Sequence, residues 1–351
     1  MIYLDNAATS FHIPDCVARA VVEAMQQAGN SGRGSSGEAM EASRIIFDTR
    51  CKIAQLFDVE GPECVAFTAN ATEALNTALF GILHPEREKV HAICTEMDHN
   101  SVLRPLYALE KRGMDLTILP ADGKGRISVD DLEAAIRPET KAIVCTHASN
   151  LTGNCNDIRS IGAIARKHGI LFIVDAAQTA GVFPISMKKD QIDILCFTGH
   201  KGLMGPQGTG AICVRPGVLV EPLKVGGSGI LTFQKEHPSD MPESLEAGTL
   251  NSHGIAGLRA SLEWIQETGI HTIRKREQML MWRFYDLVKK IPGVTVYGDF
   301  SQEDRSPVVS LNLEGEGSAE VGMILGEDYG ISVRSGGHCA PLMHEALGTV
   351  G

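Results

Sequence analysis

The chain has 351 residues, 43% of them hydrophobic, and its 32 Lys and Arg side chains face 43 Asp and Glu, a formal net charge of −11. This length exceeds the usual size of one hydrophobic core and predicts a large and a smaller domain. The negative balance argues against a nucleic-acid partner or an anionic membrane surface.

The chain starts Met1-Ile2-Tyr3, without the basic and apolar regions of a signal peptide. No apolar run approaches the roughly 18 residues that a membrane span requires. Nine cysteines without a CxxC pair indicate reduced thiols in a reducing compartment. We therefore expect a cytoplasmic protein in which most cysteines are small buried hydrophobes.

Apolar segments typical of strands alternate with helical patterns from residue 64 to residue 214. The strand-like segments are 65–68, 90–94, 115–119, 142–146, 171–174, 194–198 and 210–214. This alternation predicts an α/β fold with a mostly parallel sheet that helices cover on both faces. Ligands in such sheets bind beyond the carboxyl ends of the strands, where polar residues cluster here: Thr68 to Thr72, His99, Asn150, Asp175, His200 and Lys201.

A Gly-, Pro- and Ser-rich zone at 226–251 separates this region from the rest of the chain. Two helices are predicted at 255–268 and 270–290, followed by strands at 294–297, 308–313 and 331–334. We expect residues 16–250 to form the large domain, and residues 1–15 and 251–351 to form a smaller α+β domain.

A lysine and an aspartate at two strand ends carry the strongest chemical signal. Lys201 follows the strand 194–198, and Asp175 ends the segment 170–175. Pyridoxal phosphate (PLP) needs a lysine that holds its aldehyde as a Schiff base and an aspartate that keeps its ring nitrogen protonated. A lone Asp175 would more simply cap the next helix.

Two amides and a helix start extend this predicted site. The backbone at Ala71 and the hydroxyl of Thr72 open a helix after strand 65–68 and suit a phosphate, although a plain N-cap explains them equally well when taken alone. Gln178 and Asn150 suit the phenolic oxygen of the cofactor. Asn150 is alternatively a turn residue before Gly153.

His99 follows strand 90–94, where its ring is expected to stack on a pyridine ring and to shuttle protons near neutral pH. An exposed loop histidine is the simpler alternative. The spacing of His99, His147 and His200 fits no metal-ligand pattern, so no metal is predicted.

The loop from Arg334 to Pro341 is rich in glycine and holds Cys339 next to His338. Glycines allow such a loop to move or to approach a ligand, and the histidine is expected to favour the thiolate, which is the nucleophilic form. Arg334 is a natural clamp for a substrate carboxylate. A buried cysteine and a surface ion pair are the alternatives.

These residues resemble the cysteine desulfurases and selenocysteine lyases of the class V aminotransferase group, which are PLP enzymes of fold type I. The similarity runs from Tyr3-Leu-Asp-Asn-Ala-Ala-Thr9 to Leu347-Gly-Thr349. Its motifs are Asp175-x-x-Gln178, Thr198-x-His200-Lys201 and Arg334-x-Gly-x-His338-Cys339. Ala69 and Asn70 stand where many relatives have Arg-Gly.

The resemblance implies a role for each matched residue. Lys201 would bind PLP, with Asp175 on the ring nitrogen, His99 stacked on the ring, and Gln178 and Asn150 near the phenolic oxygen. The phosphate would contact Ala71, Thr72, Thr198, His200 and, across a homodimer interface, Thr249 of the partner. Arg334, with Asn150, would hold the substrate, and Cys339 would take the sulfur.

The activity implied is conversion of L-cysteine to L-alanine, with a persulfide on Cys339 that passes to an acceptor protein, as in the short-loop group II branch. The alternatives are a selenocysteine lyase, another class V aminotransferase or lyase in which Cys339 is incidental, and a sulfur-transfer scaffold with little catalysis. Relatives continue past the position of Gly351 with a strand that carries another arginine, so we expect the small domain to be incomplete.

Overall fold

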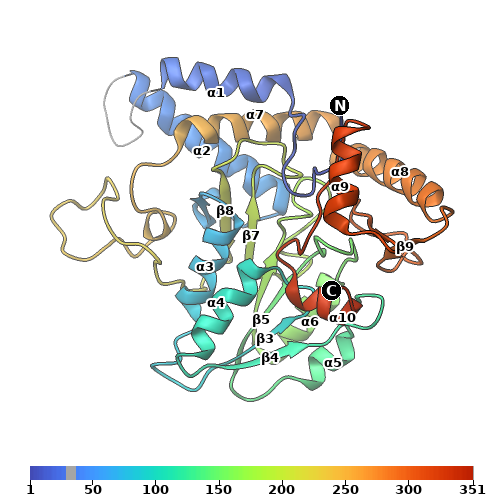
Figure 1. The fold of residues 1–351 in the computed structure, drawn as a ribbon. Coiled ribbons are helices and arrows are strands. Elements are labelled where there is room, and N and C mark those ends of the chain that lie inside the picture. The colour runs from blue at the N-terminus through green and yellow to red at the C-terminus, as the bar shows by residue number, and fades with distance from the viewer. Residues whose placement is uncertain (29–36, 351) are drawn as a thin grey trace.

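A computed structural model describes residues 1–28 and 37–350 of the chain. Its centre is a sheet whose strands follow the order β2-β8-β7-β6-β5-β3-β4 (Figure 1). The strands are β2 (Val65–Thr68), β3 (His91–Thr95), β4 (Asp115–Leu119), β5 (Thr140–Thr146), β6 (Leu171–Asp175), β7 (Ile194–Thr198) and β8 (Gly210–Val214). Neighbouring strands are parallel except where β8 pairs with β2 and β7.

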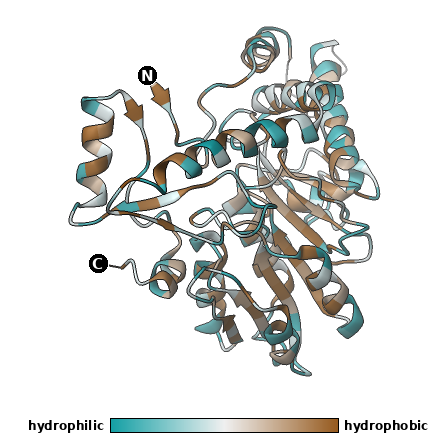
Figure 2. Ribbon diagram, turned by 90° about the vertical axis from the view of Figure 1, so that its right-hand side faces the viewer, coloured by the Kyte–Doolittle hydropathy of each residue, from teal (hydrophilic) through white to brown (hydrophobic). Residues whose placement is uncertain are grey.

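Side chains of the sheet alternate between two hydrophobic cores. In β6, Phe172 and Val174 belong to one core and Ile173 to the other. Such two-sided burial explains why these strands read as continuous apolar runs, and Figure 2 shows the sheet as hydrophobic ribbons. The cysteines of the sheet are buried as expected: Cys94, Cys145, Cys196 and Cys213.

Helices cover both faces of the sheet. One face carries α3 (Ala71–Ile82) and α4 (Asn100–Glu110), which pack on each other. On the other face, buried residues of α2 (Gly37–Phe57), α6 (Ile158–His168) and α7 (Ser252–Thr268) share a core with β6 and β7. The remaining helical segments before α7 are α1 (Asp15–Gln27), α5 (Val129–Ala134) and the short 3-10 turns η1 (Pro62–Cys64) and η2 (Glu243–Leu245).

The two ends of the described chain come together in a smaller α+β region. Strand β1 (Ile2–Tyr3) pairs in parallel with β11 (Ile331–Ser332), and β9 (Val294–Tyr297) pairs antiparallel with β10 (Ser310–Leu313). Helices α8 (Ile270–Val288), α9 (Ser318–Glu327) and α10 (Pro341–Leu347) complete it (Figure 1). Helix α7 packs on α1 and α2, and the division at residue 250 stays a prediction.

Several strand boundaries were predicted wrongly: β3 lies one residue later than expected, β5 begins two residues earlier, β6 ends one residue later, and two strands of the smaller region are shorter. The strand expected at 308–313 starts at Ser310, because the carbonyl oxygen of Val308 accepts a hydrogen bond from buried Arg305 instead of a ladder partner. The strand expected at 331–334 ends at Ser332, because its partner β1 has only two residues.

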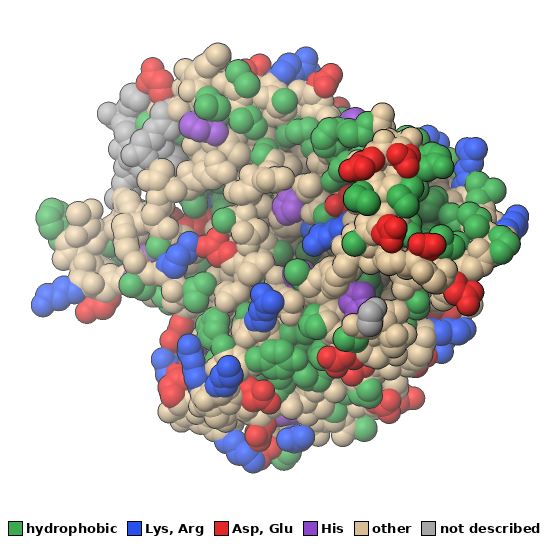
Figure 3. All heavy atoms as spheres, viewed as in Figure 1, with side chains coloured by type: hydrophobic (Ala, Val, Ile, Leu, Met, Phe, Trp, Pro, Cys, Tyr) green, Lys and Arg blue, Asp and Glu red, His purple; other side chains and the backbone are tan. Residues whose placement is uncertain are grey.

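Within the described residues, no helix is long and apolar enough to cross a bilayer. Figure 3 shows acidic side chains gathered over α9.

Candidate active site

A cavity at the carboxyl ends of the strands collects the predicted cofactor-binding residues, all except Thr249. Its lining consists of Asn70, Ala71, Thr72, His99, Ser101, Thr146, Ala148, Asn150, Asp175, Ala177, Gln178, Thr198, His200 and Lys201. They meet because parallel strands deliver their following loops to one edge of a sheet. Thr249, Arg334 and Cys339 do not line this cavity.

Lys201 and Asp175 form the charged centre of the cavity. Asp175 is buried, and its Oδ1 accepts a hydrogen bond of 2.9 Å from the backbone N–H of Ala177. Burial raises the pKa of Asp175, opposed by that hydrogen bond and by the charge of Lys201. Burial, helped by Arg334, lowers the pKa of Lys201, while Asp175 opposes the shift. The Lys201 amine therefore loses its proton more readily than an exposed lysine.

The start of α3 provides a helix cap and places one hydroxyl in the cavity. Asn70 is the N-cap, and its Oδ1 accepts a 2.9 Å hydrogen bond from Glu73 N, while Glu73 Oε2 accepts one of 2.6 Å from Ala69 N. The simpler interpretation of this motif thus holds for Asn70. Thr72 instead lines the cavity, where its hydroxyl lies 2.7 Å from Ser101 Oγ.

His99 caps α4, and this fixes its tautomer. Its Nδ1 accepts a 3.0 Å hydrogen bond from Ser101 N, and Ser101 Oγ lies 2.9 Å from the same atom. Because a backbone N–H can only donate, neutral His99 carries its proton on Nε2. Burial, with Lys201, Arg334 and Arg104, lowers the pKa of His99 to about 4. His99 is therefore uncharged at neutral pH, and its stacking and proton-shuttling role stays a prediction.

The Cys339 loop is attached to the rim of the cavity. Asn150 Nδ2 donates to the carbonyl oxygen of His338 at 2.7 Å, and Asn100 N donates to that of Cys339 at 2.8 Å. Both His338 and Cys339 have left-handed backbones, at φ 46° and 56°, which costs on the order of 1–2 kcal/mol each. Cys339 is exposed, so the alternative of a buried cysteine is wrong.

His338 does not supply the charge expected beside Cys339. Burial, with the charge of Arg334 and with His344, lowers the pKa of His338. The imidazole is therefore neutral at neutral pH. Arg334, at the start of the loop, is exposed. Its charge contributes to lowering the pKa of both His338 and Lys201.

Sequence reasoning missed the chain start as a part of the site. Gln178 Nε2 donates to the carbonyl oxygen of Ala7 at 3.0 Å, and His200 Nδ1 lies 3.0 Å from Thr9 Oγ1. Ser10 Oγ donates to the carbonyl oxygen of Lys201 at 2.8 Å. The signal for this segment in the sequence is the family motif Tyr3-Leu-Asp-Asn-Ala-Ala-Thr9.

A second missed residue is Asp98, which is fully buried next to His99. Its carboxylate accepts hydrogen bonds from Thr95 N at 2.8 Å, Thr95 Oγ1 at 2.9 Å and Thr146 N at 2.6 Å. Burial outweighs these donors and raises its pKa to about 7. Asp98 thus ties the end of β3 to the end of β5, directly before His99 in the chain.

This chain belongs to the class-V aminotransferase family, whose model matches residues 2–349. It is 34% identical over 360 residues to a probable cysteine desulfurase of Methanothermobacter thermautotrophicus, covering 99% of this chain and 88% of the relative. A cysteine desulfurase of Haloferax volcanii is 30% identical over 356 residues, covering 99% and 83%. The apo structure of a cysteine desulfurase from Thermococcus onnurineus matches with a TM-score of 0.92 at 32% identity, covering 99% of this chain and 87% of that one. The predicted fold class, PLP fold type I, is confirmed.

The cofactor of this family is PLP, and the residues present fit it. One cavity holds an amine with a lowered pKa for the aldehyde, a buried carboxylate for the ring nitrogen, and hydroxyls at a helix N-terminus for the phosphate. Among the described residues, no group of three side chains is arranged to hold a metal ion.

Proposed function

We propose that the protein is a PLP-dependent cysteine desulfurase that converts L-cysteine to L-alanine and keeps the sulfur as a persulfide on Cys339. The attachment of the Cys339 loop to the rim of the Lys201 cavity, through Asn150 and Asn100, carries this proposal. A thiol held at the mouth of a PLP cavity is placed to attack the sulfur of a bound cysteine. The names of the relatives at 30–34% identity support it.

Bound PLP would supply an electron sink at the substrate carbon. Asp175 would hold the ring nitrogen, Lys201 the aldehyde carbon, and Gln178 with Asn150 the phenolic oxygen. The amide of Ala71 and the side chains of Thr72, Thr198 and His200 would bind the phosphate. Arg334, with Asn150, would bind the substrate carboxylate, and His99 would lie on the ring with its Nε2–H available as a donor.

The sulfur transfer balances without an external oxidant. The Cys339 thiolate forms an S–S bond with the substrate sulfur while the C–S bond breaks, and the electron pair of that bond stays with carbon. The carbon takes a proton and becomes the methyl group of alanine, so carbon is reduced and sulfur is oxidised. Lys201, with its lowered pKa, or His99 would deliver that proton.

The active unit in this proposal is a homodimer in which Thr249 reaches the PLP phosphate of the partner. The segment 217–242 projects from the body (Figure 1) and exposes apolar side chains, among them Leu219 at 88%, Val225 at 71% and Phe233 at 101%. Gly248 N donates to Gly227 O, which ties Thr249 to this projection. Exposed apolar surface of this kind fits a subunit contact.

Two further assignments belong to the same proposal. Exposed Cys339 would hand its persulfide to a sulfur-acceptor protein that reaches the loop from solvent. A cytoplasmic location is supported by the nine cysteines, all free thiols, as a reducing compartment maintains them.

The decisive experiment measures alanine and sulfide released from L-cysteine by the PLP-loaded protein with dithiothreitol as reductant. L-Selenocysteine and cysteine sulfinate are run in parallel. We expect equal amounts of alanine and sulfide from L-cysteine. Turnover of selenocysteine alone would replace the proposal with a selenocysteine lyase, and turnover of sulfinate alone would replace it with another lyase of the family.

A further inference from the structure

The turn that carries Asn150 is held from the side of the small domain at three consecutive carbonyl oxygens. Ser310 Oγ donates to Leu151 O at 2.5 Å, Arg305 Nη2 donates to Thr152 O, and Ser306 N donates to Gly153 O at 2.8 Å. Three donors from the short segment 305–310 thus bind three successive acceptors, so the turn cannot shift without breaking all of them.

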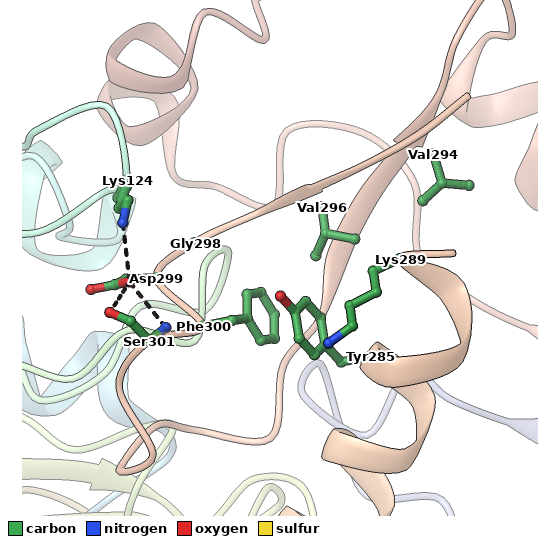
Figure 4. Close-up of a pocket in the computed structure, with 9 residues that line it drawn as sticks. All are labelled: Lys124, Tyr285, Lys289, Val294, Val296, Gly298, Asp299, Phe300 and Ser301. Atoms are coloured by element: carbon green, nitrogen blue, oxygen red, sulfur yellow. Dashed lines mark hydrogen bonds and ion pairs between the residues drawn. The ribbon is translucent and has the colours of Figure 1, made fainter. Parts of the chain in front are cut away.

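Arg305 is the central donor, and its side chain is fully buried at 0% exposure. Its guanidinium carbon lies 3.5 Å from the ring centroid of Phe300, and Phe300 stacks on Tyr285 of α8 with centroids 3.8 Å apart. Figure 4 shows the Phe300 and Tyr285 rings side by side. A packed chain therefore leads from α8 through Phe300 and Arg305 to Thr152.

A buried arginine is a costly way to fill this space. Its Nη2 partners are the carbonyl oxygens of Thr152 and Val308, and its Nε and Nη1 have no partner among the described residues. Burial lowers the pKa of Arg305 to about 10, so the group stays charged at neutral pH. Replacing it with an apolar side chain would leave the carbonyl oxygen of Thr152 without its donor, so the arginine supplies a specific contact to the turn.

The turn packs closely against the Arg305 side chain. Gly153 has φ +73°, and a Cβ atom there would lie 2.9 Å from Arg305 Nη2. On the opposite side of the turn, Asn150 lines the cofactor cavity and donates to His338 O in the Cys339 loop at 2.7 Å. The guanidinium and the Asn150 amide therefore act on the two sides of one turn.

We propose that Arg305 is a positioning residue that fixes Asn150 and, through it, the Cys339 loop at the rim of the cavity. The inference deepens the proposed desulfurase function and rests on it for its catalytic consequence. Arg305 itself touches neither substrate nor cofactor.

The test compares Arg305→Met, Asn150→Ala and the double variant as PLP-loaded proteins. We expect Arg305→Met to keep the visible absorbance of bound PLP and to lose about tenfold in kcat, with a raised KM for L-cysteine because Asn150 is also proposed to bind the substrate. If Arg305 acts through Asn150, the double variant should fall within about twofold of Asn150→Ala alone. Losses that multiply, or a parental kcat in Arg305→Met, would overturn the proposal.

A second readout does not depend on activity. Hydrogen exchange of peptides covering 334–341, and of the Asn100 amide bound to Cys339 O, should accelerate in both single variants. Arg112→Met is the matched control, because its guanidinium lies 5.1 Å from the Phe80 ring centroid, away from this turn. Parental exchange in Arg305→Met would count against the inference even if the wild-type protein proved inactive on L-cysteine.

Ser310→Ala keeps the proposal testable if Arg305→Met does not fold. It removes the neighbouring donor to Leu151 O and should give smaller changes of the same sign in kcat and in exchange at 334–341. If Arg305→Met does not fold, unchanged hydrogen exchange at 334–341 in Ser310→Ala would also reject the positioning role.

Discussion

Asn150 and His338, 188 positions apart in the chain, are joined by a 2.7 Å hydrogen bond from the Asn150 amide to the His338 carbonyl oxygen. Asn150 belongs to the wall of the cavity, and His338 precedes the exposed thiol of Cys339. The place of the thiol relative to the cavity is therefore decided by the large-domain wall as well as by the loop itself.

Replacing Cys339 should separate binding from sulfur transfer. In Cys339→Ala, L-cysteine should still perturb the visible absorbance of bound PLP, because the proposed site binds through Lys201, Asp175 and Arg334. Alanine formation should fall by about three orders of magnitude, as expected when a nucleophile is lost. Cys51→Ala, which removes a half-buried thiol of α2, should behave like the parent. Alanine release at the parental rate from Cys339→Ala would reject the desulfurase mechanism.

Lys201 should be the residue that PLP labels. Borohydride reduction of the loaded protein followed by peptide mapping should place the pyridoxyl group on Lys201, since the lowered pKa of this amine favours attack on an aldehyde. Lys201→Ala should abolish labelling, whereas Lys224→Ala, which removes a lysine paired with Glu73, should retain it. Label on Lys224 or Lys188 instead would refute the site assignment.

Shared sites predict complementation between inactive chains. A dimer mixed from Lys201→Ala and Thr249→Ala subunits contains one site with both residues intact, so part of the activity should return. Up to about a quarter of parental activity is expected from random mixing, since half of the dimers are hybrids with one good site. Native mass spectrometry would verify subunit exchange, and exchange without recovered activity would contradict the role of Thr249.

Acid should destabilise the protein through His147. Burial, with Arg274, lowers the pKa of His147 from 6.5 to about 4, and its Nδ1 lies 3.0 Å from Thr179 Oγ1. The unfolded state then binds more protons between these two values, so this contribution is complete above pH 6.5 and is lost as the pH falls towards 4, by about 3 kcal/mol.

The measurement is the difference in Tm between the parent and His147→Gln across that pH range. The parent should lose its advantage on acidification, because the variant has no imidazole to charge. His12→Gln, at an exposed position, should leave the difference flat. A parent advantage that grows as the pH falls would show that the sign is wrong.

Local residue patterns were enough to place most strands of the central sheet and the polar residues at their carboxyl ends. Segments 65–68, 115–119, 194–198, 210–214 and 294–297 match β2, β4, β7, β8 and β9 residue for residue. Their apolar runs are local and need no partner to be recognised. Asp175, Lys201 and His99 share a cavity because parallel strands align their carboxyl ends, so the strand assignment alone predicted their meeting.

The contacts that hold these residues in place appear only in the folded chain. Ser10 reaches Lys201 across 191 positions and Arg305 reaches Thr152 across 153, and no local pattern encodes such pairs. The lowered pKa of His99 also required burial and the charges of Lys201 and Arg334, which are distant in the chain. Chemical identity follows from residue type and local spacing, whereas charge state and position follow from desolvation and packing, which exist only once the chain has folded.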